Sequence, residues 1–156
     1  MGLWERLIGT GPARERDARD VLPELLASYR QEARLARQIR EHADQAPHQT
    51  GAQGLRAVAE EQERLAQLLR DKIVALGGAV SEQTAPTRGG KNHWARVTRD
   101  LEDTQVLRRH YNEQAIRWDP GLPDVVALYH TLEQGKARIT ALLRDIALRA
   151  DPHALD

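Results

Sequence analysis

Apolar side chains recur every three or four residues along four long stretches of the chain, which is the spacing of amphipathic α-helices. No stretch shows the strict alternation of apolar and polar residues that is typical of a half-buried strand. The recurring apolar positions are, stretch by stretch, Leu22, Leu25, Tyr29, Ala36, Ile39 and Ala43; Leu55, Val58, Leu65, Leu69, Ile73 and Leu76; Val97, Leu101, Leu107, Tyr111, Ala115 and Trp118; and Val125, Tyr129, Leu132, Ile139, Leu143 and Ile146. The pattern predicts an all-α protein built from four long helices.

Proline and glycine residues mark the ends of these helices. The predicted ranges are 20–44, 51–76, 93–118 and 123–150. Thr50 and Gln53 have the spacing of a capping box at the start of the second helix, and Gly77 suits its end. Asn92 is expected to cap the third helix, and Pro123 to open the fourth.

The lengths of the connections predict how the helices are arranged. Short links join the first helix to the second and the third to the fourth, so each pair should form an antiparallel hairpin. The link from Gly77 to Asn92 is long and polar. About 16 extended residues can span some 50 Å, whereas each helix is roughly 38 Å long, so this link can make the second and third helices parallel. We expect one domain at 17–151, an amphipathic segment at 1–16 and a tail at 152–156.

The second and fourth helices contain the same short sequence. Leu68–Asp71 reads LLRD, and so does Leu142–Asp145. Superimposing the two copies aligns two further pairs, Gln62 with Lys136 and Leu65 with Ile139. The repeat predicts a bundle with an internal two-fold.

Each apolar stripe has one polar interruption near the middle of its helix. These interruptions are Glu32, Gln62, Thr104 and Lys136. A carboxylate that is buried alone is costly, so Glu32 needs a partner. Lys136 can supply the opposite charge, while Gln62 and Thr104 can supply hydrogen bonds. The pattern therefore predicts a buried polar layer around a Glu32–Lys136 ion pair; the alternative is that Lys136 reaches solvent.

The stretch at 55–71, LRAVAEEQERLAQLLRD, resembles the second helix of ferritin-like, rubrerythrin-type proteins. The helix lengths and the long crossover extend the resemblance to residues 20–150, and it implies a ferritin-like four-helix bundle. That family holds two irons with a Glu on each of two helices and Glu-x-x-His on each of the other two. Only Glu32 matches, and the other five positions hold Gln62, Leu65, Thr104, Lys136 and Ile139. We therefore expect a bundle without its di-iron site or any cofactor, which serves as an assembly or protein-interaction module rather than as an enzyme.

A shifted metal site is the first alternative, and it would make the protein a metal-dependent oxidase or a metal store. Its candidate ligands are His130, Glu133, Glu61, Glu102 and His110. The remaining histidines lie near helix ends or in connections and are expected to be solvated: His42, His48, His93 and His153.

Gly135 lies in mid-helix, where glycine costs about 1 kcal/mol relative to alanine. We expect it to allow close packing against a bulky neighbour such as Tyr29 or Tyr111. The alternative is a cavity for a small ligand beside the polar layer, and this would be a binding function.

Composition narrows the class of partner. The 23 basic and 23 acidic residues balance, so no net field attracts nucleic acid. There is no cysteine, which excludes disulfides and zinc–thiolate sites. No apolar run approaches the roughly 20 residues of a membrane span, so a cytoplasmic protein is expected. The short apolar stripe of Leu3, Trp4, Leu7 and Ile8 is expected to dock on the bundle, on the second subunit of a homodimer or on another protein.

Overall fold

The computed structural model describes residues 17–83 and 85–151. Within them, a short 3-10 turn leads into four α-helices and no strand is present. The elements are the turn at Ala18–Val21, α1 at Leu22–Asp44, α2 at Gln49–Ala75, α3 at His93–Trp118 and α4 at Pro123–Ala150. The prediction of an all-α protein with four long helices is confirmed. The segment at 1–16 and the tail at 152–156 lie outside the described residues.

Two of the expected helix ends are formed by the residues that the sequence indicated. The Asn92 side chain accepts a hydrogen bond from the Ala95 N–H at 2.8 Å and caps α3. Gly77 follows α2 with a φ of 84°, a backbone conformation that residues other than glycine rarely adopt. The Gly78 N–H then donates to the Ile73 carbonyl at 2.9 Å, which closes the last turn.

The expected capping box at the start of α2 is wrong. The helix begins at Gln49, so Thr50 already lies inside its first turn rather than in front of it. His48 occupies the N-cap position in extended backbone, and no side chain caps the helix there. The first turn of α2 also carries no acidic residue. The helix therefore starts without the side-chain acceptor that Thr50 and Gln53 were expected to provide.

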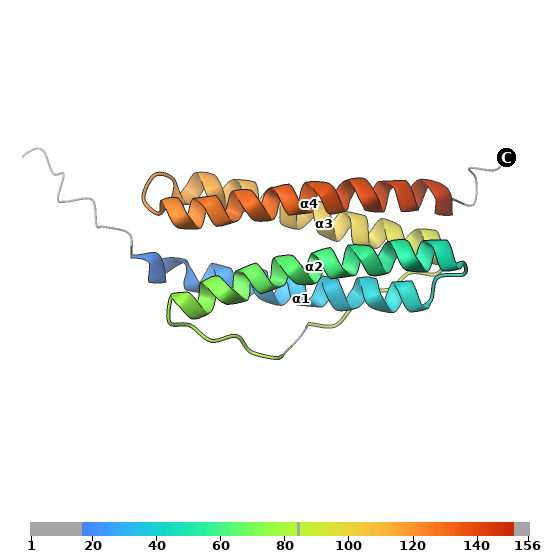
Figure 1. Cartoon of the computed structure of the whole chain (residues 1–156), viewed down its shortest axis with the longest axis horizontal. Coiled ribbons are helices and arrows are strands. Elements are labelled where there is room, and N and C mark those ends of the chain that lie inside the picture. The colour runs from blue at the N-terminus through green and yellow to red at the C-terminus, as the bar shows by residue number, and fades with distance from the viewer. Residues whose placement is uncertain (1–16, 84, 152–156) are drawn as a thin grey trace, which may run out of the picture.

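The helices are arranged as the connection lengths predicted. Figure 1 shows α1 antiparallel to α2, and α3 antiparallel to α4. The link at 76–92 runs back along the bundle, so α2 and α3 point the same way. The two hairpins face each other with α1 on α3 and α2 on α4. This is the crossover topology rather than a simple up-and-down bundle.

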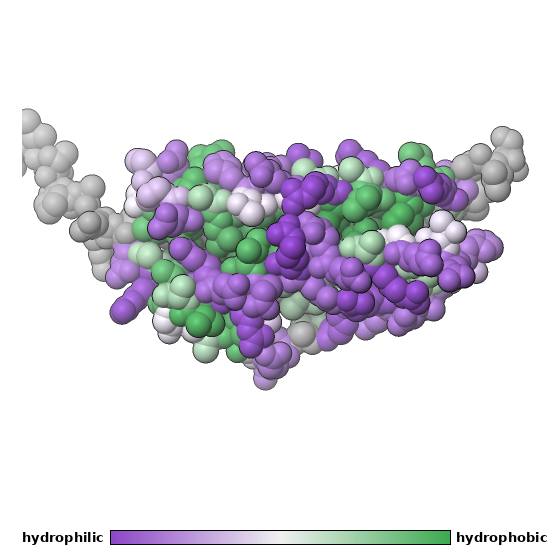
Figure 2. Space-filling view, viewed as in Figure 1, coloured by the Kyte–Doolittle hydropathy of each residue, from purple (hydrophilic) through white to green (hydrophobic). Residues whose placement is uncertain are grey.

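The core is aliphatic and draws on all four helices. Leu35, Leu65, Val97 and Ile139 are each fully buried, one from each helix. Polar side chains cover most of the visible surface, and apolar atoms are exposed mainly between α4 and α2 (Figure 2). Within the described residues, no helix combines the length and apolar character needed to cross a bilayer.

Gly135 packs against Leu65, and not against a tyrosine as expected. A Cβ atom at Gly135 would lie only 2.6 Å from Leu65 Cδ2 and 2.9 Å from Leu65 Cδ1. The reason is the arrangement of the bundle: the face of α4 that carries Gly135 is turned toward α2, whereas Tyr29 lies on α1 and Tyr111 lies on α3, which packs against another part of α4. The leucine fills the space that the glycine leaves, so a ligand cavity has no room at this contact.

Gly135→Ala is therefore expected to destabilise the protein by about 1–3 kcal/mol, because the added methyl overlaps Leu65. This runs against the helix propensity of alanine, which alone would stabilise α4 by about 1 kcal/mol. Urea denaturation of Gly135→Ala, Leu65→Ala and the double variant measures the coupling. Leu65→Ala alone should cost about 2–5 kcal/mol. The double variant should be more stable than the sum predicts, and strict additivity would contradict the overlap.

Candidate functional site

A polar layer crosses the bundle core near the middle of the four helices. Glu32 of α1, Gln62 of α2, Thr104 of α3 and Lys136 of α4 all have side chains with no solvent exposure. The polar interruptions of the four apolar stripes thus all point inward. The alternative in which Lys136 reaches solvent is wrong.

Lys136 lies at the centre of the hydrogen bonds in this layer. Its ammonium group donates to the Glu32 carboxylate and to Gln62 Oε1, the latter at 2.5 Å. The Gln62 amide also donates to the backbone carbonyl of Glu32 at 3.2 Å. The second carboxylate oxygen of Glu32 accepts from the Tyr111 hydroxyl at 2.5 Å. Four side chains, one from each helix, are therefore linked into one network: Glu32, Gln62, Tyr111 and Lys136.

The fourth residue expected in this network is absent from it. Thr104 is buried, but its hydroxyl has no hydrogen-bond partner among the described residues. Tyr111 of α3 takes the place that Thr104 was expected to fill. The sequence pattern did not indicate that Tyr111 hydrogen-bonds to Glu32, because Tyr111 lies on the apolar stripe of its helix and was interpreted as a core residue.

Burial and the ion pair determine the charge states of the layer. Burial lowers the pKa of Lys136, and the adjacent Glu32 carboxylate partly opposes this shift. Burial also raises the pKa of Tyr111 well above its ordinary value, and the negative charge of Glu32 raises it further. Tyr111 is therefore a neutral phenol at physiological pH and can donate its proton to the Glu32 carboxylate.

The layer does not fit a di-iron centre of the kind that ferritin-like, rubrerythrin-type proteins hold. Such a centre needs four carboxylates and two histidines around its two cations. Here the only carboxylate is Glu32, and the Lys136 ammonium holds the positive charge against it. Leu65 and Ile139, at the two histidine positions, are apolar and fully buried. A fixed ammonium group at the centre of the layer would repel a divalent cation.

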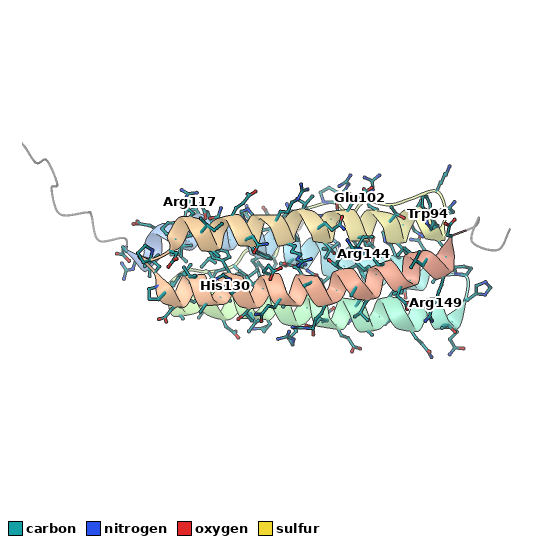
Figure 3. All side chains as sticks on the ribbon, turned by 90° about the horizontal axis from the view of Figure 1, so that it is seen from above. Trp94, Glu102, Arg117, His130, Arg144 and Arg149 are labelled. Carbon is teal, nitrogen blue, oxygen red and sulfur yellow. The ribbon has the colours of Figure 1, made fainter. Side chains whose placement is uncertain are left out.

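The residues of the alternative, shifted metal site do not come together. Figure 3 shows His130 and Glu102 far apart along the bundle axis, on different helices. Glu61 and Glu133 are each engaged by arginine side chains, and His110 lies near Ser28 at 3.5 Å. Over 17–83 and 85–151, no three His, Asp or Glu side chains form a set that could hold a metal ion.

A second buried polar cluster was not predicted, and it joins α1 to α3. Asp100 has no exposed surface, and its carboxylate accepts from the Gln38 amide at 2.8 Å. Its other oxygen lies 2.7 Å from His42 Nδ1. His42 is only 2% exposed, so the expectation that it is solvated is wrong. It sits in the last turns of α1, but α3 covers it there.

The same cluster fastens the crossover to the bundle. Asp103 accepts from Arg34 of α1 at 3.3 Å and from Arg88 of the crossover at 2.8 Å. The backbone N–H of Arg88 donates to Gln38 Oε1 at 2.8 Å. A signal for this cluster exists in the sequence, because Asp100 fits the spacing from Val97 as well as Leu101 does. We call these residues the crossover cluster: Arg34, Gln38, His42, Arg88, Asp100 and Asp103.

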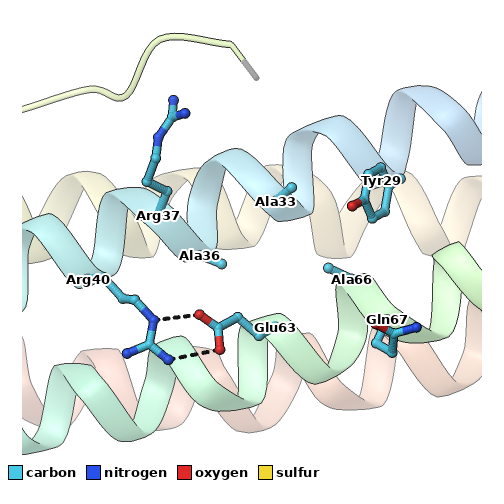
Figure 4. Close-up of a pocket in the computed structure, with 8 residues that line it drawn as sticks. All are labelled: Tyr29, Ala33, Ala36, Arg37, Arg40, Glu63, Ala66 and Gln67. Carbon is cyan, nitrogen blue, oxygen red and sulfur yellow. Dashed lines mark hydrogen bonds and ion pairs between the residues drawn. The ribbon is translucent and has the colours of Figure 1, made fainter. Parts of the chain in front are cut away.

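A shallow groove of about 420 Å³ lies on the outer face between α1 and α2 (Figure 4). The small side chains of Ala33, Ala36 and Ala66 line it. Arg40 and Glu63 form a two-point ion pair across it, at 2.5 and 2.8 Å. The lining thus offers methyl groups and a neutralised ion pair, and this is no set for acid–base or nucleophilic catalysis.

Comparison with known proteins identifies the fold of this chain. No protein-family model matches the sequence, and no curated protein matches it. Among solved structures, the chain is similar to a dodecameric thioferritin, the bacterioferritin-related protein of Bacteroides fragilis. The two are 14% identical, with a TM-score of 0.76 over 86% of this chain and 88% of that chain. The fold is that of a ferritin-like four-helix bundle.

Lys136→Met is expected to lower the free energy of unfolding by about 3–5 kcal/mol, because it leaves the Glu32 carboxylate buried without its counter-charge. The double variant Glu32→Gln/Lys136→Met removes both charges and should recover most of this loss. Urea denaturation at neutral pH measures both. A single variant as stable as the wild type would show that the ion pair is not coupled to folding.

Asp100→Asn is expected to change how stability depends on pH. Burial raises the pKa of Asp100 above its ordinary 3.8, with the His42 hydrogen bond only partly opposing it. The folded state therefore binds this proton more tightly than the unfolded state, so the contribution is present below pH 3.8 and is lost as pH rises through the folded pKa. The stability of the wild type relative to Asp100→Asn should fall over that window. The exposed Asp71→Asn is the control, and equal pH profiles for wild type and Asp100→Asn would contradict the shift.

Proposed function

We propose that this protein is a metal-free ferritin-like bundle that serves as an assembly or protein-interaction module and not as an enzyme. The observation that carries the proposal is the position of the Lys136 ammonium group, which is held by Glu32 and Gln62 in the layer where the family's metals would sit. The Lys136 ammonium group supplies a positive charge beside the Glu32 carboxylate, and no bound ion is needed to do so. The rubrerythrin-type relationship and the loss of an ancestral di-iron site are parts of this proposal.

The connectivity of the layer supports a structural role. In a di-iron bundle, the metals tie four helices together through their ligands. In this chain, the linked side chains of Glu32, Tyr111, Gln62 and Lys136 also come from four helices. The buried network leaves no open position for a substrate. A bundle that is tied together in this way keeps its shape without a cofactor, and its surface is then available for binding other subunits.

Assembly is the form of interaction that we favour. The thioferritin that resembles this chain is a dodecamer, and we extend to this chain the property of self-association but not the number of subunits. A dimer is the smallest assembly that satisfies the proposal. The apolar stripe of Leu3, Trp4, Leu7 and Ile8 lies outside the described residues, and its docking role stays a prediction. A cytoplasmic location belongs to the same proposal.

Metal analysis separates this function from an iron-dependent one. Protein purified without chelator should contain no stoichiometric iron, and titration with ferrous iron in air should consume no oxygen above a protein-free blank. The reason is that Lys136 repels a cation at the only layer that resembles the family's metal site. Stoichiometric bound iron with oxygen consumption would overturn the proposal.

A variant that replaces the layer by carboxylates provides the positive control for this assay. Gln62→Glu/Thr104→Glu/Lys136→Glu places four buried carboxylates in the core with Glu32. Their mutual repulsion should be relieved by a divalent cation, so this variant should gain thermal stability when ferrous or manganous ion is added. The wild type should show no such gain under the same conditions.

A further inference from the structure

A hollow of about 880 Å³ lies between the beginning of α2 and the end of α4. Its wall on α2 includes the very small residues Gly51, Gly54 and Ala57, and its wall on α4 includes Leu142 and Ile146. Figure 2 shows the apolar surface between α4 and α2 toward this end of the bundle. The hollow is thus a recess on the outer face of the protein, away from the polar layer, and its lining combines these small and apolar residues with polar ones such as Thr50, Gln53 and His93.

The small residues on α2 give the hollow its shape. A Cβ atom at Gly54 would lie 3.2 Å from Ile146 Cδ1, and one at Gly51 would lie 3.3 Å from His93 Nε2. The two glycines therefore allow α4 and the start of α3 to approach α2 closely. Glycine in a helix interior destabilises the helix relative to alanine. The two glycines that shape the hollow therefore lower the stability of α2.

An exposed leucine stands next to the recess. Leu142 lines the hollow from α4 and is 48% exposed. Removing a leucine side chain from water is favourable. Because Leu142 stays half exposed in the single chain, its burial against a partner would stabilise a complex. One surface therefore carries both a protruding apolar side chain and a recess that is lined in part by small and apolar residues.

Charged side chains of both signs line the hollow: Asp145 and Arg149 on α4, and Asp151 just after it. Asp145 and Arg149 both line the recess, and they pair across one helical turn at 3.2 Å. Both are largely exposed, at 60% and 71%, and Figure 3 shows Arg149 near that end of α4. When two copies of such a surface meet about a two-fold axis, each arginine can face the aspartate of the other copy.

We infer that the hollow between α2 and α4 binds a second copy of this chain through the same surface. Leu142 of each copy enters the recess of the other beside Gly54 and Ala57, and Asp145 pairs with Arg149 across the interface. A two-fold contact requires a self-complementary surface, and a projection, a recess and both signs of charge on one face meet that requirement. The inference rests on the proposed assembly function and names the surface that carries it.

A small-molecule ligand fits these features less well. Ligand sites have polar groups that converge on the bound molecule. The lining does include His48, His93 and Asp151, which lie at the ends of three different helices. The Asp145–Arg149 pair, however, is already satisfied within α4 and lies in solvent, and a small ligand would leave Leu142 exposed. A second copy uses the leucine, the recess and the charged pair at once.

Sedimentation velocity over a range of protein concentrations tests the interface. The wild type should form dimers or larger assemblies, and Leu142→Glu should weaken the association by at least 10-fold, because it places a carboxylate beside Gly54 and Ala57 of the other copy. Ile116→Glu is the matched control: Ile116 is 78% exposed on α3 and does not line the hollow. Circular dichroism of both variants confirms that the bundle is folded.

A charge exchange tests the same surface without changing its apolar part. Asp145→Arg alone should weaken the association, because it places like charges against Arg149 of the other copy. Asp145→Arg/Arg149→Asp should restore it, since the pairs are re-formed with their signs exchanged. Failure of the double variant to regain the association of the wild type would contradict the pairing.

Cross-linking gives a direct readout, because the chain has no cysteine of its own. A mixture of the single variants Leu142→Cys and Ala57→Cys should form a mixed disulfide-linked dimer under mild oxidation, because the two positions meet across the interface. A mixture of Ile116→Cys and Ala57→Cys should not. If Leu142→Glu leaves the assembly unchanged, the interface lies elsewhere: this inference fails while the proposed assembly function stands. If the wild type is a monomer at every concentration, both fail, and the metal assay then separates a metal-free bundle from an iron protein.

Discussion

A buried ammonium group must have its hydrogen-bond acceptors fixed around it, and Lys136 places this constraint on the whole bundle. No water solvates it, since its side chain has no exposed surface, so the Glu32 carboxylate and the Gln62 amide have to replace the solvent. These partners come from α1 and α2, whereas Lys136 comes from α4. A slip of one residue in any of these helices would leave the charge unpaired, which is costly in a core. The ion pair therefore fixes the register of the helices, and metal ligands do the same in a di-iron bundle.

Much of the fold was predictable because the signals that determine it are local. The spacing of apolar residues predicted the four helices. The length of the link between α2 and α3 predicted the crossover topology. The inward positions of Glu32, Gln62 and Lys136 were predictable for the same reason, since each interrupts an otherwise apolar stripe. The role of Tyr111 was not, because periodicity records that a residue is buried and says nothing of where its hydroxyl points. The predicted partner of Gly135 was wrong because the contact depends on which face of α4 is turned toward each neighbouring helix.

The crossover cluster shows what a single helical period leaves undetermined. Asp100 and Leu101 both continue the spacing from Val97, and hydropathy alone favours Leu101 as the buried residue. The structure buries Asp100 fully and Leu101 only in part. The difference comes from Gln38 of α1 and Arg88 of the crossover, whose hydrogen bonds make a carboxylate acceptable in this part of the core. Because these partners are distant in sequence, no local pattern could have indicated them.

The central polar layer and the crossover cluster connect different sets of elements in the bundle. The central layer ties α4 to α1 and α2, with Tyr111 adding α3, and the crossover cluster ties α1, α3 and the link at 76–92. Polar groups buried in this way are specific only when their partners are present, because an unsatisfied member costs more than an apolar replacement would. The core therefore already contains the directional contacts that a cofactor would otherwise supply. The central layer and the crossover cluster thus supply directional contacts between all four helices from the chain's own side chains.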